Sequence, residues 1–455
     1  MARDVRLIRS PISVTGMVLT TISAVLFVVV FLADLLGVHT NPYIGILFFL
    51  VLPAVFIVGL ILIPLGAWIE RRRRAAGKAP TTVQWPRIDL NDPTQRRTAV
   101  IVFALTMANI VIVSLAAYRG VEYMDSVGFC GQVCHTAMGP EFVAHQAGSH
   151  AGVRCVNCHV GSGATSFIKS KLSGSRRAVA VAFGNYSRPT TAEPDELIGA
   201  AETCEQCHSA GRFHGDKVRK ISEYADDEKN SESVTTLTLH LGGGGPRAGS
   251  AAGIHWHANP ANAIEYVATD SARQEIPYVR VSDGRGGVRE YAIEGANLQD
   301  LAQRPRRRMD CTDCHNRPSH TIATTPERAV NAVMANGVID KTLPFVRREA
   351  VKALKASHPT QESGIQEVGR ALRDFYGTLP AGGADRGPRV DRAVAVVEEI
   401  YRRNVFPEMK VSFGTYPSNI GHFDSPGCFR CHDDNHKSKD GPTIGQDCET
   451  CHSIQ

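Results

Sequence analysis

Long apolar runs are lacking from the chain after residue 118, although 43% of its 455 residues are hydrophobic. A further membrane span in this part is excluded, because a spanning helix needs about 20 consecutive apolar residues. Aromatic residues are also few, at 7%, so the polar part of the chain has little material for an apolar core of its own. The formal net charge of +5 is small for this length and gives no argument for a nucleic-acid partner.

No cysteine lies outside a repeated motif. All twelve form six pairs, and a histidine directly follows the second cysteine of every pair. This pattern is the attachment signature of c-type haem, in which both thiols form thioethers with the porphyrin and the histidine binds the iron. A disulfide framework or zinc ribbons would also use paired cysteines, but neither predicts the histidines. The sequence therefore predicts six covalently bound haem c groups.

Haems one to six are numbered in chain order. The first motif has three residues between its cysteines, and the others have two. The predicted attachment cysteines are Cys130 and Cys134, Cys155 and Cys158, Cys204 and Cys207, Cys311 and Cys314, Cys428 and Cys431, and Cys448 and Cys451. The predicted proximal iron ligands are His135, His159, His208, His315, His432 and His452.

Eleven further histidines are available for the opposite face of each haem, where a low-spin iron needs a second strong ligand. For haem one, Met138 is the weak-ligand candidate, with His135 or His145 as rivals. His255 and His257 alternate around one tryptophan, so an extended strand would point both rings the same way. The remaining expected distal ligands lie a few residues from a motif, and they are His150, His320, His422 and His436.

Three apolar runs lie near the N-terminus, at about 14–38, 43–69 and 98–118. At ~1.5 Å per residue, a helix of ~25 residues crosses a hydrocarbon core of ~30 Å. A signal peptide is the alternative for the first run, but its apolar region is usually only ~7–15 residues long. Residues 1–118 are therefore predicted to form a three-helix membrane anchor.

Basic residues predict the orientation of this anchor. Arg3, Arg6 and Arg9 precede the first run, and the arginine block at 71–74 follows the second. Flanks rich in lysine and arginine stay on the cytoplasmic side. The N-terminus is therefore predicted to be cytoplasmic, and the chain after residue 118 periplasmic, in a bacterial inner membrane. Haem is attached covalently on that outer face, so the motifs favour the same topology independently.

The predicted fold class is mainly α, in which the anchor precedes a periplasmic multihaem domain of low regular secondary structure. Residues 119–210 and 311–455 each carry three motifs, and 211–310 is a cysteine-free insert between them. Strand-like stretches within the insert predict a small antiparallel sheet, and they lie at 263–269, 276–282 and 288–293. Apolar residues at three- and four-residue steps predict a helical spacer, with helices at 326–336, 344–357, 364–376 and 390–405.

Residues 119–210 resemble the NapC/NirT family of membrane-anchored multihaem cytochromes. The three-helix anchor and the additional C-terminal haems look more like the larger inner-membrane cytochromes of metal-reducing bacteria. The resemblance implies that electrons pass from a membrane quinol, in particular menaquinol, along a haem wire to a periplasmic or outer-membrane acceptor. It rests on Phe129 before Cys130, on Met138 after His135, on Ser149 and His150 before the second motif, and on Phe167, Lys169 and Lys171 after it.

A quinol dehydrogenase needs polar groups that orient the quinol hydroxyls and accept their protons. We expect Lys169 and Lys171 to contact the quinol oxygen beside haem one, with Asp34 or Asp125 as proton acceptor. Alternatively, both lysines extend to phospholipid headgroups in the bilayer.

Two rival functions stay open. One is a terminal reductase of a small oxyanion, although the Cys-x-x-Cys-Lys motif of pentahaem nitrite reductases is absent. The other is an electron-transfer subunit of a larger respiratory complex.

Overall fold

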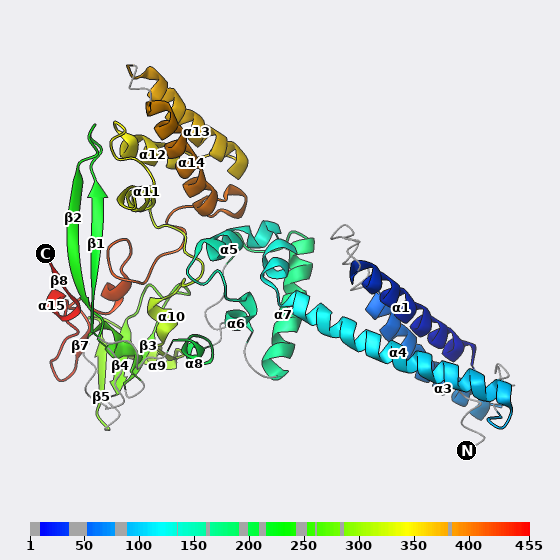
Figure 1. The fold of residues 1–455 in the computed structure, drawn as a ribbon. Coiled ribbons are helices and arrows are strands. Elements are labelled where there is room, and N and C mark those ends of the chain that lie inside the picture. The colour runs from blue at the N-terminus through cyan, green and yellow to red at the C-terminus, as the bar shows by residue number, and fades with distance from the viewer. Residues whose placement is uncertain are drawn as a thin grey trace. The chain divides into compact units, whose positions relative to one another are not determined.

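The computed structural model describes residues 10–35, 52–77, 89–133, 135–160, 164–190, 199–208, 215–242, 253–259, 262–282, 286–380 and 385–455. They form two compact units, Met1–Phe129 and Cys130–Gln455. We name them the anchor unit and, because it carries the cysteine–histidine motifs, the motif unit. The predicted fold class is confirmed: the chain is mainly helical, with three apolar N-terminal helices and a small content of sheet (Figure 1).

The anchor unit contains three helices, and among the described residues these three are long and apolar enough to cross a membrane. They are α1 (Pro11–Leu35), α3 (Leu52–Ala75) and α4 (Pro93–Met124). Helix α4 ends six residues beyond the predicted limit of 118. Its start is fixed by Asp92, whose side chain accepts a hydrogen bond from the backbone N–H of Thr94.

Small residues let α1 and α3 approach closely. A Cβ atom on Gly59 would lie 2.4 Å from the hydroxyl of Thr20, and one on Gly66 would lie 2.5 Å from Ser13. The Ser13 hydroxyl also donates to the carbonyl oxygen of Ile63 at 2.8 Å. Packing through glycine and serine is typical of helices that associate within lipid, where apolar burial gives no driving force between them.

The motif unit contains two antiparallel sheets. One has the strand order β1-β2-β8 and the other β6-β3-β4-β5-β7. Strands β3, β4 and β5 correspond to the three predicted strands. The strands are β1 (Asp216–Tyr224), β2 (Glu232–His240), β3 (Ala263–Val267), β4 (Tyr278–Ser282), β5 (Val288–Ala292), β6 (Arg307–Arg308), β7 (Lys437–Ser438) and β8 (His452–Ile454).

The β1–β2 hairpin was missed by the sequence analysis. Both strands are rich in charged and hydroxyl residues and much of their surface is exposed, so the apolar alternation that predicts a strand is weak. Strand β8 pairs with β2 in the first sheet, and strand β7 pairs with β5 in the second. Because β7 and β8 come from the end of the chain, both sheets link the insert at 211–310 to the segment at 311–455.

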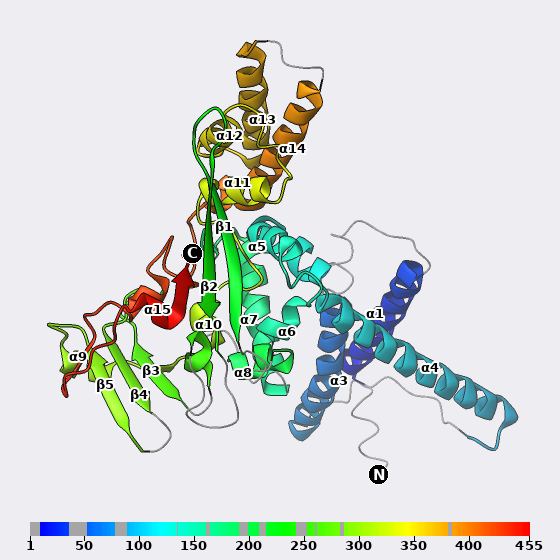
Figure 2. The ribbon, with the colours of Figure 1, turned by 60° about the vertical axis from the view of Figure 1, so that its left-hand side comes forward.

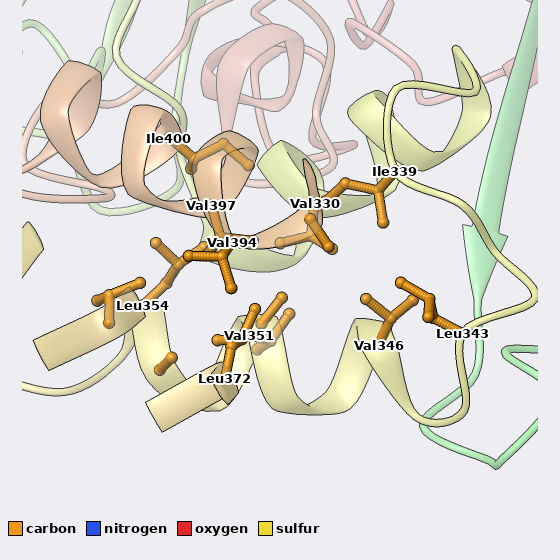
Figure 3. Packing of buried hydrophobic residues seen from close by; sticks show 14 of the residues in the cluster. Val330, Ile339, Leu343, Val346, Val351, Leu354, Leu372, Val394, Val397 and Ile400 are labelled. Atoms are coloured by element: carbon orange, nitrogen blue, oxygen red, sulfur yellow. The ribbon is translucent and has the colours of Figure 1, made fainter. Parts of the chain in front are cut away.

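Four helices form a bundle beside the hairpin (Figure 2). They are α11 (Pro326–Ala335), α12 (Val346–Leu354), α13 (Gln361–Thr378) and α14 (Arg386–Asn404). Each agrees with a predicted helix to within a few residues. Their apolar faces meet in one cluster, in which Val330, Leu343 and Val394 are fully buried (Figure 3). Tyr224 of β1 joins the same cluster.

The remaining helices are short, except for α5 and α7. They are α5 (His135–Ala147), α6 (Cys155–His159), α7 (Ala164–Ala182), α8 (Ala200–Thr203), α9 (Leu298–Gln303), α10 (Cys311–Cys314) and α15 (Cys448–Cys451). The short turns are the π-helical η2 (Phe129–Val133) and the 3-10 helices η4 (Cys204–Gln206), η6 (Ile254–Ala258), η7 (Pro407–Met409) and η8 (Gly427–Arg430).

Candidate haem-binding sites

Each of the five regular motifs lies on a single helical turn. In four of them the backbone N–H of the histidine donates to the carbonyl of the first cysteine, as from His315 to Cys311 at 2.8 Å. Such a turn keeps two thiols and an imidazole together, as thioether attachment and iron ligation by one haem require. The turns are α6, η4, α10, η8 and α15.

The first motif differs because its extra residue lies in the π-helical turn η2. A π-helix closes its hydrogen bonds over five residues instead of four, so one added residue fits within a single turn. Cys134 lies outside the described residues, as does the side chain of His135. Met138 is partly buried in α5, three residues after His135.

Four motif histidines each lie beside a second histidine from elsewhere in the chain. With metal–nitrogen bonds of ~2 Å and a ring centre ~1 Å behind each nitrogen, two imidazoles that share one iron have ring centres about 6 Å apart. The ring-centre distances are 6.1 Å for His159 and His320, 6.0 Å for His208 and His150, 5.8 Å for His432 and His257, and 6.1 Å for His452 and His422. The residues present therefore fit bis-histidine haem iron.

Contacts at Nδ1 of three of these imidazoles support bis-histidine ligation. Nδ1–H of His150 donates to the carbonyl of Pro318 at 3.2 Å, and that of His257 to the carbonyl of Ile254 at 2.9 Å. Nδ1 of His432 lies 3.0 Å from the carbonyl of Gly445. A metal-bound imidazole usually donates its second N–H in this way, which fixes its tautomer and ring orientation.

His255 lies near His315, the histidine of the fourth motif. Its pKa is lowered first by burial and then by the neighbouring imidazole of His315. His255 and His257 belong to the 3-10 helix η6 and not to the extended strand that the sequence analysis expected. Each nevertheless lies close to a motif histidine, His255 to His315 and His257 to His432.

Two other histidines have both ring nitrogens engaged by protein atoms. His436 is 1% exposed, with Nδ1 2.8 Å from the carboxylate of Asp433 and Nε2 2.7 Å from the carbonyl of Ile276. His145 contacts the carbonyl of Val153 through Nε2 and the side chain of Gln146 through Nδ1. In this structure both imidazoles are held by protein atoms, and the ring centre of His145 also lies 6.1 Å from that of His320.

The residues expected to contact quinol are distributed over both units. Lys169 is exposed on α7, and an open groove of about 620 Å³ runs beside it, lined also by Leu172, Arg176 and Arg177. The side chains of Lys171 and Asp34 lie outside the described residues. Asp125 caps the C-terminal end of α4.

A buried ionic network that the sequence analysis did not foresee joins two motifs. Asp313, inside the fourth motif, is 2% exposed and accepts hydrogen bonds from Tyr266, Arg273 and Arg307 at 2.6, 2.8 and 3.0 Å. Arg430, inside the fifth motif, donates to the carbonyl of Asp313 at 2.7 Å. Arg307, which lies in the basic stretch at 304–308, contacts this carboxylate.

Three membrane-capable helices, joined to a unit with repeated cysteine–histidine motifs and paired imidazoles, define a membrane-anchored multihaem c-type cytochrome. The chain is 38% identical over 448 residues to the cytochrome c-type protein ImcH of Geobacter sulfurreducens, and the match covers 98% of this chain and 88% of that relative. The chain therefore belongs to the ImcH family of cytochrome c-type proteins. No protein-family model and no solved structure matches it.

Proposed function

We propose that this chain carries six haem c groups, oxidises membrane quinol at the periplasmic face of a bacterial inner membrane, and delivers the electrons to a periplasmic or outer-membrane acceptor. The observation that carries the proposal is the set of four imidazole pairs with ring centres 5.8–6.1 Å apart. When bound, haem c supplies one-electron carriers that cycle between ferric and ferrous iron.

The proposed ligand set follows from these pairs. His320, His150, His257 and His422 serve as distal ligands to haems two, three, five and six, and His255 serves haem four. His436 and His145 are left out of these five because their nitrogens bind protein atoms. Met138 is the proposed weak ligand of haem one, with His135 or His145 as its rivals. Each of the five distal histidines comes from outside the motif that it completes, so haem binding ties distant segments together.

Chain connectivity supports a quinol site at haem one. The third apolar run ends at about Tyr118 within α4, and Cys130 follows only twelve residues later. A lipid-soluble donor such as menaquinol can thus reach the first motif without leaving the membrane. The NapC/NirT-like site would use Lys169 and Lys171 to bind the quinol oxygen. Asp34 or Asp125 would accept the protons released on oxidation.

Quinol oxidation by the purified full-length protein in detergent tests this function. Haem absorbance should report reduction by a menaquinol analogue, and Lys169→Ala or Lys171→Ala should slow it at least about tenfold, a loss of ~1.4 kcal/mol of transition-state stabilisation. Reduction by dithionite should not change. Lys217→Ala, which removes an exposed lysine from β1, is the matched control. Normal quinol kinetics in both variants at 169 and 171 would disprove this placement and favour headgroup anchoring.

The haem count has a separate test. The mass of the denatured chain should exceed that of the polypeptide by six haems, because thioethers survive unfolding. A count of five would point to the first motif with its wider cysteine spacing, and the variant Cys130→Ala with Cys134→Ala would then leave the number of bound haems unchanged.

A further inference from the structure

Glu141 of α5 is directed at one of the paired histidines. Its carboxylate oxygen Oε2 lies 3.2 Å from Nδ1 of His320, and its own backbone carbonyl lies 3.0 Å from the same nitrogen. The side chain of Glu141 is 12% exposed, so water screens this contact weakly. Nδ1 of His320 is thus held between two oxygen atoms of one residue, and one of these oxygens is charged.

Arg317 holds the carboxylate in place. It donates to both carboxylate oxygens of Glu141, at 2.8 and 3.1 Å, and through Nε to the carbonyl of His320 at 2.8 Å. Its guanidinium lies 3.7 Å from the ring centre of Tyr416. The hydroxyl of Tyr416 donates in turn to the carbonyl of Thr190 at 3.1 Å. Burial, followed by the charge of Glu141, raises the pKa of Tyr416 to about 12, so this ring stays a neutral phenol.

The ring centre of His320 lies 6.1 Å from that of His159 of the second motif and 6.1 Å from that of His145. In the proposed pairing with His159, Nε2 of His320 binds iron, and Nδ1 beside Glu141 is the remaining nitrogen. The Nδ1 atoms of His150 and His257 contact the carbonyls of Pro318 and Ile254, which are neutral acceptors. His320 differs from these two by the carboxylate at its Nδ1.

We propose that Glu141 is a positioning residue that lowers the reduction potential of haem two. The backbone carbonyl of Glu141 accepts the Nδ1 proton, and the carboxylate places a negative charge 3.2 Å from the same nitrogen. A weakly screened negative charge beside an axial ligand stabilises ferric iron over ferrous iron, because the ferric state carries one more positive charge. The reaction affected is the one-electron reduction of this iron. Because α5 begins at His135, the same helix carries the proximal ligand of haem one and the group that tunes haem two.

This inference rests on the proposed pairing of His159 with His320, and its test is a redox titration of the purified holoprotein. Glu141→Gln keeps the size of the side chain and the backbone carbonyl but removes the charge. One of the six haem components should shift to a higher potential by at least a tenfold change in the ferric–ferrous equilibrium, which is 59 mV for one electron. Glu141→Asp, which keeps the charge, should shift that component less.

Two further variants make the outcome decisive. His320→Met should mark the component that belongs to haem two, by changing its ligand. Glu265→Gln breaks a comparable ion pair with Arg280, 2.7 Å long, on β3 and β4, and should leave all potentials unchanged.

Unchanged potentials in Glu141→Gln, a shift in a component other than the one His320→Met marks, or loss of a haem in Glu141→Gln would each overturn the inference. Failure of the wild-type protein to oxidise quinol would refute the proposed function alone, because the titration does not use quinol.

Discussion

The helical bundle and the haem-motif region of the same unit are stabilised in different ways. In the bundle, some twenty buried side chains from α11–α14 and their neighbours form one apolar cluster, and it includes none of the motif residues. Around the motifs the buried apolar clusters are small, and the buried contacts include ion pairs and histidines such as Asp313 and His436. The bundle supplies its own core, whereas the motif region depends on the groups it binds.

The largest effect should come from preventing haem attachment, by replacing all twelve cysteines with alanine. The region around the motifs should lose its fixed structure, because its paired imidazoles have no iron between them and ligand binding contributes directly to folding. Hydrogen exchange should show unprotected amides at 135–160, 199–208 and 427–455 and continued protection in α11–α14. Equal loss of protection in both regions would contradict the comparison.

The second effect concerns the ionic network in the motif region. Asp313→Ala should destabilise this region by ~3–5 kcal/mol, because it leaves Arg273 and Arg307 partly buried without their shared carboxylate. Local hydrogen exchange around α10 measures the change. Asp300→Ala removes an exposed partner of Arg304 and should cost at most ~1 kcal/mol, so it serves as the control.

The bundle and the haem-motif region also differ in how well the sequence predicts them. The bundle helices were predictable because their apolar periodicity is local, and the motifs because attachment chemistry fixes their spacing. The distal ligands were less predictable. His320 and His436 both follow a motif closely in sequence, yet one faces His159 and the other has Asp433 and Ile276 at its two ring nitrogens.

Contacts between residues far apart in the chain could not be predicted from the sequence. His159 and His320 are 161 residues apart, and Glu141 meets Arg317 across 176 positions. No local pattern encodes such a meeting, because it depends on how the segments pack. The same limit applies to Arg430, which lies inside one motif and donates to the backbone of another. A local feature of the sequence does indicate an unusual turn at the first motif, because the extra residue between its cysteines lies in the π-helix η2.

The third effect belongs to the bundle. Leu372 is 1% exposed in the shared cluster, and Leu372→Ala should cost ~2–5 kcal/mol through lost apolar contact and the cavity it leaves. Chemical denaturation measures the lost free energy of unfolding, and hydrogen exchange in α11–α14 locates it. Haem potentials should stay at their wild-type values. Val338→Ala truncates a side chain that is 42% exposed and should change stability little.

The smallest effect tests whether a slight loss of stability in the bundle leaves the haem potentials of the motif region unchanged. Thr360 caps α13, and its hydroxyl accepts a hydrogen bond from the backbone N–H of Ser363, whose own side chain returns to the backbone of Thr360. Thr360→Ala leaves helix-end N–H groups without this partner, so the bundle should lose ~1 kcal/mol. Thr360→Ser keeps the hydroxyl and should restore most of it. Since α13 carries none of the motif residues, the potentials should be identical in all three proteins. A shift of any potential in Thr360→Ala alone would mean that the bundle acts on the haem sites and is more than a separately stable spacer.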